Sequence, residues 1–167
     1  MIRRCGSSDF EAVYSLVNDA AQAYRGVIAA DCWNEPYMPR DELREEIASG
    51  VVFWGFEEAG QLASVMGLQQ AGDVALIRHA YTLTARQNAG LGTALLVHLR
   101  RQTERPMLVG TWKAAGWAVR FYEGRGFRLV PQEQKSALLR RYWTVPERQI
   151  DESVVLADEA WFRTGRR

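Results

Sequence analysis

The sequence has almost no excess of charge of either sign. Lysine and arginine number 21 and aspartate and glutamate number 20, so the formal net charge is +1. A nucleic-acid-binding surface needs a basic stripe that displaces counterions from phosphates, so we expect no nucleic-acid partner. Arg163, Arg166 and Arg167 make the end of the chain basic. We interpret residues 158–167 as a solvated C-terminal tail.

Long apolar runs, cysteines and histidines are also scarce. No stretch approaches the roughly 20 apolar residues that a membrane-spanning helix needs. The charged residues 1–9 are not followed by the apolar run of a secretory signal. The two cysteines, Cys5 and Cys32, form no CxxC pair and have no clustered histidines beside them. These absences predict a cytoplasmic protein with free thiols, no membrane partner and no metal.

The composition is that of a folded globular domain. Hydrophobic residues make up 47% of the 167 residues and charged residues 25%. This length suits one compact domain and is short for two. We therefore predict a single domain over residues 1–157.

The periodicity of apolar residues predicts a mixed α/β fold. Strand-like runs are expected at 1–5, 51–57, 61–69, 74–84, 107–112, 127–130 and 153–157. Helices are expected after Ser8, at 41–47, after Gly90, at 114–123 and at 132–141. Short turns join the second, third and fourth strands and imply antiparallel pairing, whereas helices separate the later strands and would allow a parallel half. The expected architecture is a central mixed sheet of about seven strands with helices on both faces.

Helix ends give two further local signals. Ser8 with Glu11 three residues later has the spacing of a capping box. After the strand that ends near Thr84, a glycine-bearing turn leads into a helix; it comprises Gln87, Asn88, Ala89, Gly90, Leu91, Gly92 and Thr93. The first N–H groups of a helix lack internal partners and attract anions, and glycine lets a phosphate approach the main chain. The turn is a candidate anion site to which Arg86 would add a cation. The alternative is that its glycines only cap the helix.

Two common nucleotide motifs do not fit this turn. The dinucleotide fingerprint needs Gly or Ala where this chain has Leu95, and an acidic residue about twenty positions on, where it has 110–112 without an acid. The P-loop needs Lys directly after its last glycine, where this chain has Thr93. Both motifs are therefore excluded.

Two segments together resemble the GNAT superfamily of N-acetyltransferases. The family signature is Gln or Arg, two residues, Gly, one residue, then Gly or Ala, which residues 87–92 match in full. A second family block, Ala-x-x-Phe-Tyr-Glu-x-x-Gly-Phe, is present at 118–127. Ala115 departs from the family, which often has an asparagine there to contact the pantetheine arm. The resemblance implies a GNAT-type fold and direct transfer of acetyl from acetyl-CoA to a primary amine of a small molecule or peptide, with CoA as product. It implies no metal and no covalent enzyme intermediate, and a homodimer would be compatible with it.

The resemblance also suggests roles at the reacting atoms. Tyr122 matches the family's usual general acid, which protonates the departing thiolate; the alternative is a core tyrosine beside Phe121. His79 lies mid-strand, and the unperturbed pKa of a histidine is near neutrality, which suits a general base; the alternative is a satisfied core histidine. Thr82 and Leu83 occupy the strand end where the family's main chain pairs with pantetheine, with an N–H aimed at the thioester oxygen.

The acceptor pocket is expected from carboxylates and aromatic side chains. The candidate residues of this pocket are Asp31, Trp33, Glu35, Tyr37 and Trp112, although each aromatic residue alone could equally belong to the core. Two other functions are open: a catalytically silent acyl-CoA-binding or regulatory module on the same fold, and a protein that binds another nucleotide at the glycine turn.

Overall fold

A computed structural model describes residues 1–165. The chain divides into two compact units, which we describe in turn. The first comprises Met1–Ala23, Asn34–Gln70 and Ile77–Glu104; the second comprises Tyr24–Trp33, Ala71–Leu76 and Arg105–Arg167, of which residues up to 165 are described. A single domain over residues 1–157 stays a prediction.

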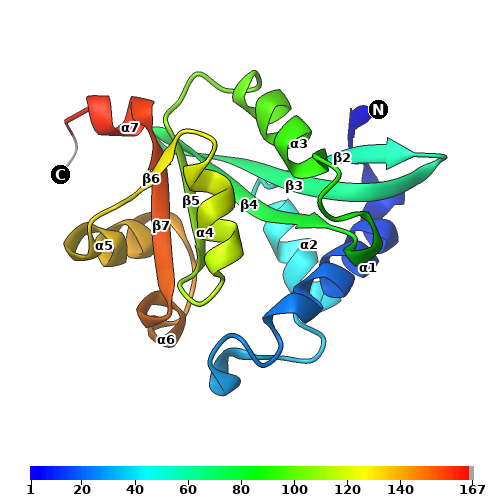
Figure 1. Cartoon of the computed structure of the whole chain (residues 1–167), viewed down its shortest axis with the longest axis horizontal. Helices are drawn as coiled ribbons and strands as arrows, with labels where there is room; N and C mark the ends of the chain where they lie inside the picture. The colour runs from blue at the N-terminus through cyan, green and yellow to red at the C-terminus, as the bar shows by residue number, and fades with distance from the viewer. Residues whose placement is uncertain (166–167) are drawn as a thin grey trace. The chain divides into compact units, whose positions relative to one another are not determined.

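The strands form one seven-stranded sheet (Figure 1). They are β1 (Ile2–Arg4), β2 (Val52–Glu58), β3 (Gln61–Ala71), β4 (Val74–Thr82), β5 (Met107–Trp112), β6 (Phe127–Leu129) and β7 (Ser153–Asp158). Their hydrogen-bonded order is β1-β2-β3-β4-β5-β7-β6. The expected fold class, a mixed sheet of about seven strands with helices, is confirmed.

Seven α-helices accompany the sheet in the described residues. They are α1 (Phe10–Ala21), α2 (Arg40–Ala48), α3 (Leu91–Arg100), α4 (Gly116–Glu123), α5 (Gln132–Tyr142), α6 (Glu147–Asp151) and α7 (Glu159–Arg163). Short 3-10 turns lie at Ser7–Asp9, Gln22–Tyr24, Ala30–Cys32 and Thr84–Arg86. Of these helices, α6 and α7 were not expected from the sequence, because each is too short to show a helical period.

The first unit is built on an antiparallel meander. β1 pairs with β2 and β2 pairs with β3, as the short turn between β2 and β3 predicts. α1 buries residues three and four positions apart, including Val13, Leu16 and Val17, against Leu43 of α2 and the β2–β3 pair. This apolar cluster is a core of the first unit and holds α1 and α2 against β2 and β3.

The start of α1 differs from the expected capping box. A 3-10 turn over Ser7–Asp9 precedes the helix, and the Asp9 carboxylate accepts the Gly6 N–H at 2.7 Å. Glu11 instead makes an ion pair with Arg40 at 3.0 Å. The prediction was wrong because Asp9, one residue after Ser8, satisfies the N–H that precedes the turn.

The second unit corrects the expectation of a parallel half for its own strands. β5 and β6 each pair with β7, and both pairings are antiparallel. The helical connection from β5 to β6 was predicted correctly, but β5 and β6 are not neighbours in the sheet, because a space one strand wide separates them. β7, the last strand of the described residues, fills that gap, as the orange strand in Figure 1 shows, and it runs antiparallel to both neighbours.

The core of the second unit lies between β5, β7 and the helices that follow β6. It includes Leu139 and Trp143, which approach the backbone of Gly110 so closely that an added Cβ would lie 3.4–3.5 Å from them. Beyond β7, the expected tail begins with α7, whose Trp161 is only 3% exposed. Arg163 is exposed, and Arg166 and Arg167 lie outside the described residues. Within residues 1–165, no helix combines the length and apolar character that crossing a membrane requires.

Candidate functional site

The glycine turn is an exposed loop in the first unit. It follows the 3-10 turn at Thr84–Arg86, and residues 84–90 are all exposed. Asn88 and Gly90 have left-handed φ angles of +63° and +79°. Asn and Gly are the residues that adopt this region most readily. The loop is therefore shaped by its sequence and is not covered by other side chains of its unit.

The N–H groups of this loop remain available. In the described part of the chain, those of residues 87–90 donate no hydrogen bond. The first hydrogen bond of α3 runs from the Ala94 N–H to the Gly90 carbonyl at 3.1 Å, so the N–H groups of Leu91 and Gly92 precede the helical ladder. A row of unpaired donors at the positive end of a helix dipole is suited to hold an anion.

Side chains distant in sequence fix the base of the loop. The Asp19 carboxylate of α1 accepts hydrogen bonds from the Thr84 N–H at 2.9 Å and from the Thr84 hydroxyl at 3.1 Å. Arg86, expected to add a cation to the anion site, makes a two-pronged ion pair with Glu58 at 2.7 and 2.8 Å. Asp19 and Glu58 were missed because they lie 65 and 28 residues from their partners.

The end of β4 is held by a buried serine. Ser64 is 1% exposed; its hydroxyl donates to the Tyr81 carbonyl at 3.0 Å and lies 2.8 Å from the Thr82 hydroxyl. The Leu83 N–H donates to the Ala63 carbonyl at 2.9 Å. The expectation that an N–H at this strand end aims at a thioester is therefore wrong for Leu83, because β3 already occupies that donor. Any main-chain role of Leu83 falls to its carbonyl.

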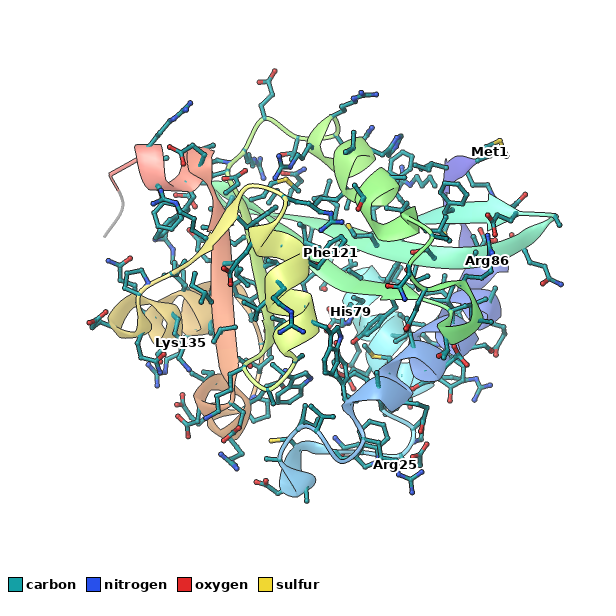
Figure 2. The ribbon with its side chains drawn as sticks, viewed as in Figure 1. Met1, Arg25, His79, Arg86, Phe121 and Lys135 are labelled. Carbon is teal, nitrogen blue, oxygen red and sulfur yellow. The ribbon has the colours of Figure 1, made fainter. Side chains whose placement is uncertain are left out.

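His79 occupies an unusual position within β4. Its φ is +53°, which non-glycine residues rarely adopt in a strand. Its imidazole stacks on Phe53 with ring centroids 6.1 Å apart. Its Nε2 is buried, has no hydrogen-bond partner among the described residues, and lies 3.6 Å from a carboxylate oxygen of Glu46. Burial lowers the pKa of His79 below its ordinary value, so the ring is neutral near pH 7. Figure 2 shows His79 on β4 beside α2.

Tyr122 lies in α4 of the second unit and is 5% exposed. Its ring meets those of Phe121 and Phe127 edge-on, at centroid distances of 5.0 and 5.5 Å. Burial raises the pKa of Tyr122 above its ordinary value, with the nearby Tyr24 adding to the effect. The phenol is therefore protonated near pH 7 when no substrate is bound.

The expected acceptor residues fall in both units. In the second unit, Asp31 is ion-paired with Arg148 at 2.7 Å, Trp33 is half-buried and Trp112 is 7% exposed. In the first unit, Glu35 is exposed and Tyr37 packs against the apolar core. The charge of Asp31 is already balanced by Arg148, which lowers the pKa of that carboxyl group. A role for these five residues in acceptor binding stays a prediction.

The sequence matches a known family over most of its length. The model of the family described as acetyltransferase (GNAT) domain matches residues 18–141, which contain both motifs. The chain belongs to the GNAT acetyltransferase family. As a GNAT protein, it is an acetyl-CoA-dependent N-acetyltransferase that acts on an amine. No curated protein matches the sequence.

Solved structures share the same fold. A GNAT acetyltransferase from Staphylococcus aureus has 16% identity and a TM-score of 0.69, with 95% of this chain and 97% of that chain covered. The PaiA N-acetyltransferase of Thermoplasma acidophilum, solved with coenzyme A, has 15% identity, a TM-score of 0.71 and the same coverage. The ribosomal-protein-S18-alanine N-acetyltransferase of Escherichia coli has 17% identity and a TM-score of 0.64, with 95% and 92% covered. At these identities the likeness establishes the fold.

Proposed function

We propose that this GNAT protein transfers the acetyl group of acetyl-CoA directly to a primary amine of a small molecule or peptide, with both substrates bound at once. The observation that carries the proposal is the exposed main chain of residues 87–90, whose N–H groups donate no hydrogen bond in the described chain, followed by the N–H groups of Leu91 and Gly92 that precede the helical ladder. Diphosphate is the part of acetyl-CoA that such donors would hold.

The loop suits a diphosphate sterically as well as electrostatically. A Cβ built on Gly90 would meet no atom within 4 Å, so the space above its main chain is open. Because Arg86 is paired with Glu58, the loop offers neutral N–H donors and a helix dipole in place of a free cation. We therefore assign residues 87–93 to the diphosphate, and Thr82 and Leu83 to the pantetheine arm through their main chain.

The amine has to lose a proton before it attacks. A lysine-like amine has a pKa of about 10.4 and is mostly protonated at neutral pH. We assign His79 as the base because its lowered pKa keeps the imidazole neutral and able to accept a proton. The amine nitrogen then bonds to the thioester carbon as the carbon–sulfur bond breaks. The sulfur keeps the electron pair, the nitrogen loses its second proton to solvent as the amide forms, and the first proton remains on His79 until solvent removes it.

The departing thiolate needs a proton, which we assign to Tyr122. A buried phenol with a raised pKa is a weak acid, so transfer to a thiolate of pKa near 8.5 is unfavourable unless the two groups are well positioned. Its contribution to turnover should therefore lie below the range of about 10²- to 10⁴-fold that is usual for general acids, at about tenfold or less.

The acceptor class is best approached through a panel of amines. One solved relative is named for acetylating an alanine of ribosomal protein S18, so peptides that begin with alanine belong in the panel beside small-molecule amines. Asp31, Trp33, Glu35, Tyr37 and Trp112 remain our choice for acceptor contacts, because carboxylates and aromatic rings suit a cationic amine.

The decisive experiment measures the release of free CoA from acetyl-CoA across this panel. We expect at least one amine to give turnover above hydrolysis, and thermal stabilisation by CoA and acetyl-CoA but not by NAD or ATP. Stabilisation by acetyl-CoA without turnover on any amine would favour the silent acyl-CoA-binding module. Stabilisation by NAD or ATP alone would contradict the assignment of the loop.

A further inference from the structure

A polar cluster surrounds His79 inside the first unit. Glu46 of α2 accepts two close contacts from the Arg78 guanidinium, at 2.7 and 2.8 Å, and lies 3.6 Å from the Nε2 of His79. These three side chains are only 17%, 11% and 15% exposed, respectively. One buried carboxylate therefore faces two cationic or potentially cationic groups that are neighbours on β4.

The carboxylate of Glu46 is held in place by a longer network. Arg78 also donates to the side-chain oxygen of Gln69 on β3 at 2.9 Å, and the Gln69 amide donates to the Ser49 carbonyl just after α2 at 3.1 Å. α2, β3 and β4 are thus tied together at one point. A carboxylate that is held in place by other hydrogen bonds can fix the orientation of a neighbouring imidazole.

The pKa shifts of Glu46 and His79 suit a carboxylate that stabilises a protonated imidazole. Burial raises the pKa of Glu46, but His79 and Arg78 outweigh it and hold the pKa below its ordinary value, so Glu46 is ionised. For His79, burial and Arg78 lower the pKa whereas Glu46 raises it. Glu42, one turn earlier on α2, has a pKa raised by burial and by the neighbouring Glu46 and Glu45. The imidazolium is therefore opposed by Arg78 and stabilised by Glu46.

We propose that Glu46 is the positioning residue for the base of this acetyltransferase: it fixes the Nε2–H of His79 toward itself and stabilises the imidazolium that forms when Nδ1 accepts the amine proton. The proposal rests on the proposed function of His79. Because Nε2 faces Glu46, the transferred proton has to arrive at Nδ1. Closure of the 3.6 Å separation to hydrogen-bonding distance accompanies protonation.

A test independent of catalysis uses the two histidines of the chain. With only His79 and His98 present, NMR titration of the imidazole C–H signals follows each ring, and His98→Gln assigns them. Glu46→Gln should lower the pKa of His79 by about one unit or more, because an opposite charge at this distance is removed. Glu45→Gln removes the same charge one residue away on α2 and should leave the His79 pKa unchanged. An equal His79 pKa in both variants would overturn the proposal.

Turnover gives the second readout. With an amine that the wild-type protein acetylates, Glu46→Gln should lower kcat about tenfold with little change in KM for acetyl-CoA, whereas Glu45→Gln should keep wild-type kcat. Glu46→Asp keeps the charge at a greater distance, serves if Glu46→Gln unfolds, and should give an intermediate His79 pKa. If no amine is acetylated, the proposed function fails while the titration still decides whether Glu46 is coupled to His79. Wild-type turnover in Glu46→Gln would reject the positioning role alone.

Discussion

Two largely buried ionisable side chains, one in each unit, differ in their hydrogen bonding. Lys135 of α5 is 2% exposed, and its Nζ donates to the carbonyls of Ile150 and Ser153, the second at 2.9 Å. The His79 side chain is 15% exposed and its Nε2 is buried, but this nitrogen has no hydrogen bond within the described chain and lies 3.6 Å from the Glu46 carboxylate, beyond hydrogen-bonding distance.

The difference distinguishes a side chain that has a structural role, Lys135, from one whose protonation state can change, His79. Lys135 donates to two carbonyls where α6 leads into β7, so moving it would take a charged donor away from both. His79 has a left-handed backbone, an unsatisfied nitrogen and an adjacent charge. Strain and unsatisfied groups persist where function requires them. The region around Lys135 should therefore govern stability, and the region around His79 should govern catalysis.

The sharpest way to break this comparison is Lys135→Met, which keeps the volume and removes the donor. We expect the free energy of unfolding to fall by about 3 kcal/mol, since two carbonyls lose a hydrogen bond from a buried, charged donor. Urea denaturation measures it. Lys113→Met, at a lysine whose side chain is 52% exposed in a 3.5 Å ion pair, should cost under about 0.5 kcal/mol. An equal loss of unfolding free energy in the two variants would mean that Lys135 does not have the structural role proposed for it.

The corresponding change in the other region is His79→Asn, because asparagine tolerates the left-handed φ. We expect kcat to fall about 100-fold, as for loss of a general base, with the unfolding transition almost unchanged. Steady-state kinetics and urea denaturation on the same preparations measure the two effects. His98→Asn is the matched control and should retain activity. A loss of stability in His79→Asn without loss of kcat would reverse the assignment.

Gly90→Ala extends the comparison to the loop. A left-handed φ costs alanine about 1 kcal/mol, and the new methyl group would point into the open space assigned to the diphosphate. We expect KM for acetyl-CoA to rise about tenfold in consequence. Gly60, in the turn between β2 and β3, has a φ of +77° and equally open surroundings. Gly60→Ala should show the same loss of stability with unchanged KM, and equal KM values in both variants would sink the loop assignment.

The smallest expected effect is that of Tyr122→Phe, about tenfold or less in kcat with an unchanged affinity for acetyl-CoA. The reference is Tyr142→Phe, which removes a hydroxyl that donates to Asp73 and should cost stability and not turnover. Pre-steady-state release of CoA separates the chemical step from binding. Unchanged turnover in Tyr122→Phe would leave that residue a core tyrosine.

Prediction from the sequence succeeded where the signal was local. The seven strands were expected close to their observed bounds because period and turn residues are read over a few positions. The loop at 87–92 was expected because Gly90 and a following helix define it. The two motifs together predicted the family, and the match to the family model established it.

Prediction failed where the outcome depended on contacts between distant residues. The helices between the late strands would have allowed parallel pairing, yet β7 enters between β5 and β6 and pairs antiparallel with both. Arg86 was expected at the anion site, but Glu58 holds it, and the Leu83 N–H is taken by Ala63. Glu46 gave no signal at all, since one glutamate among several on an exposed helix looks like a solvated face.

By itself, the sequence determined which segments form strands and helices, where a bare main chain precedes a helix, and to which family the chain belongs. Tertiary structure alone decided which strand lies beside which, which carboxylate faces His79 and which donors of the loop remain unpaired. The reason is physical: backbone preference and periodicity act over a few residues, whereas the partner of a buried charge or an N–H group is chosen by three-dimensional proximity.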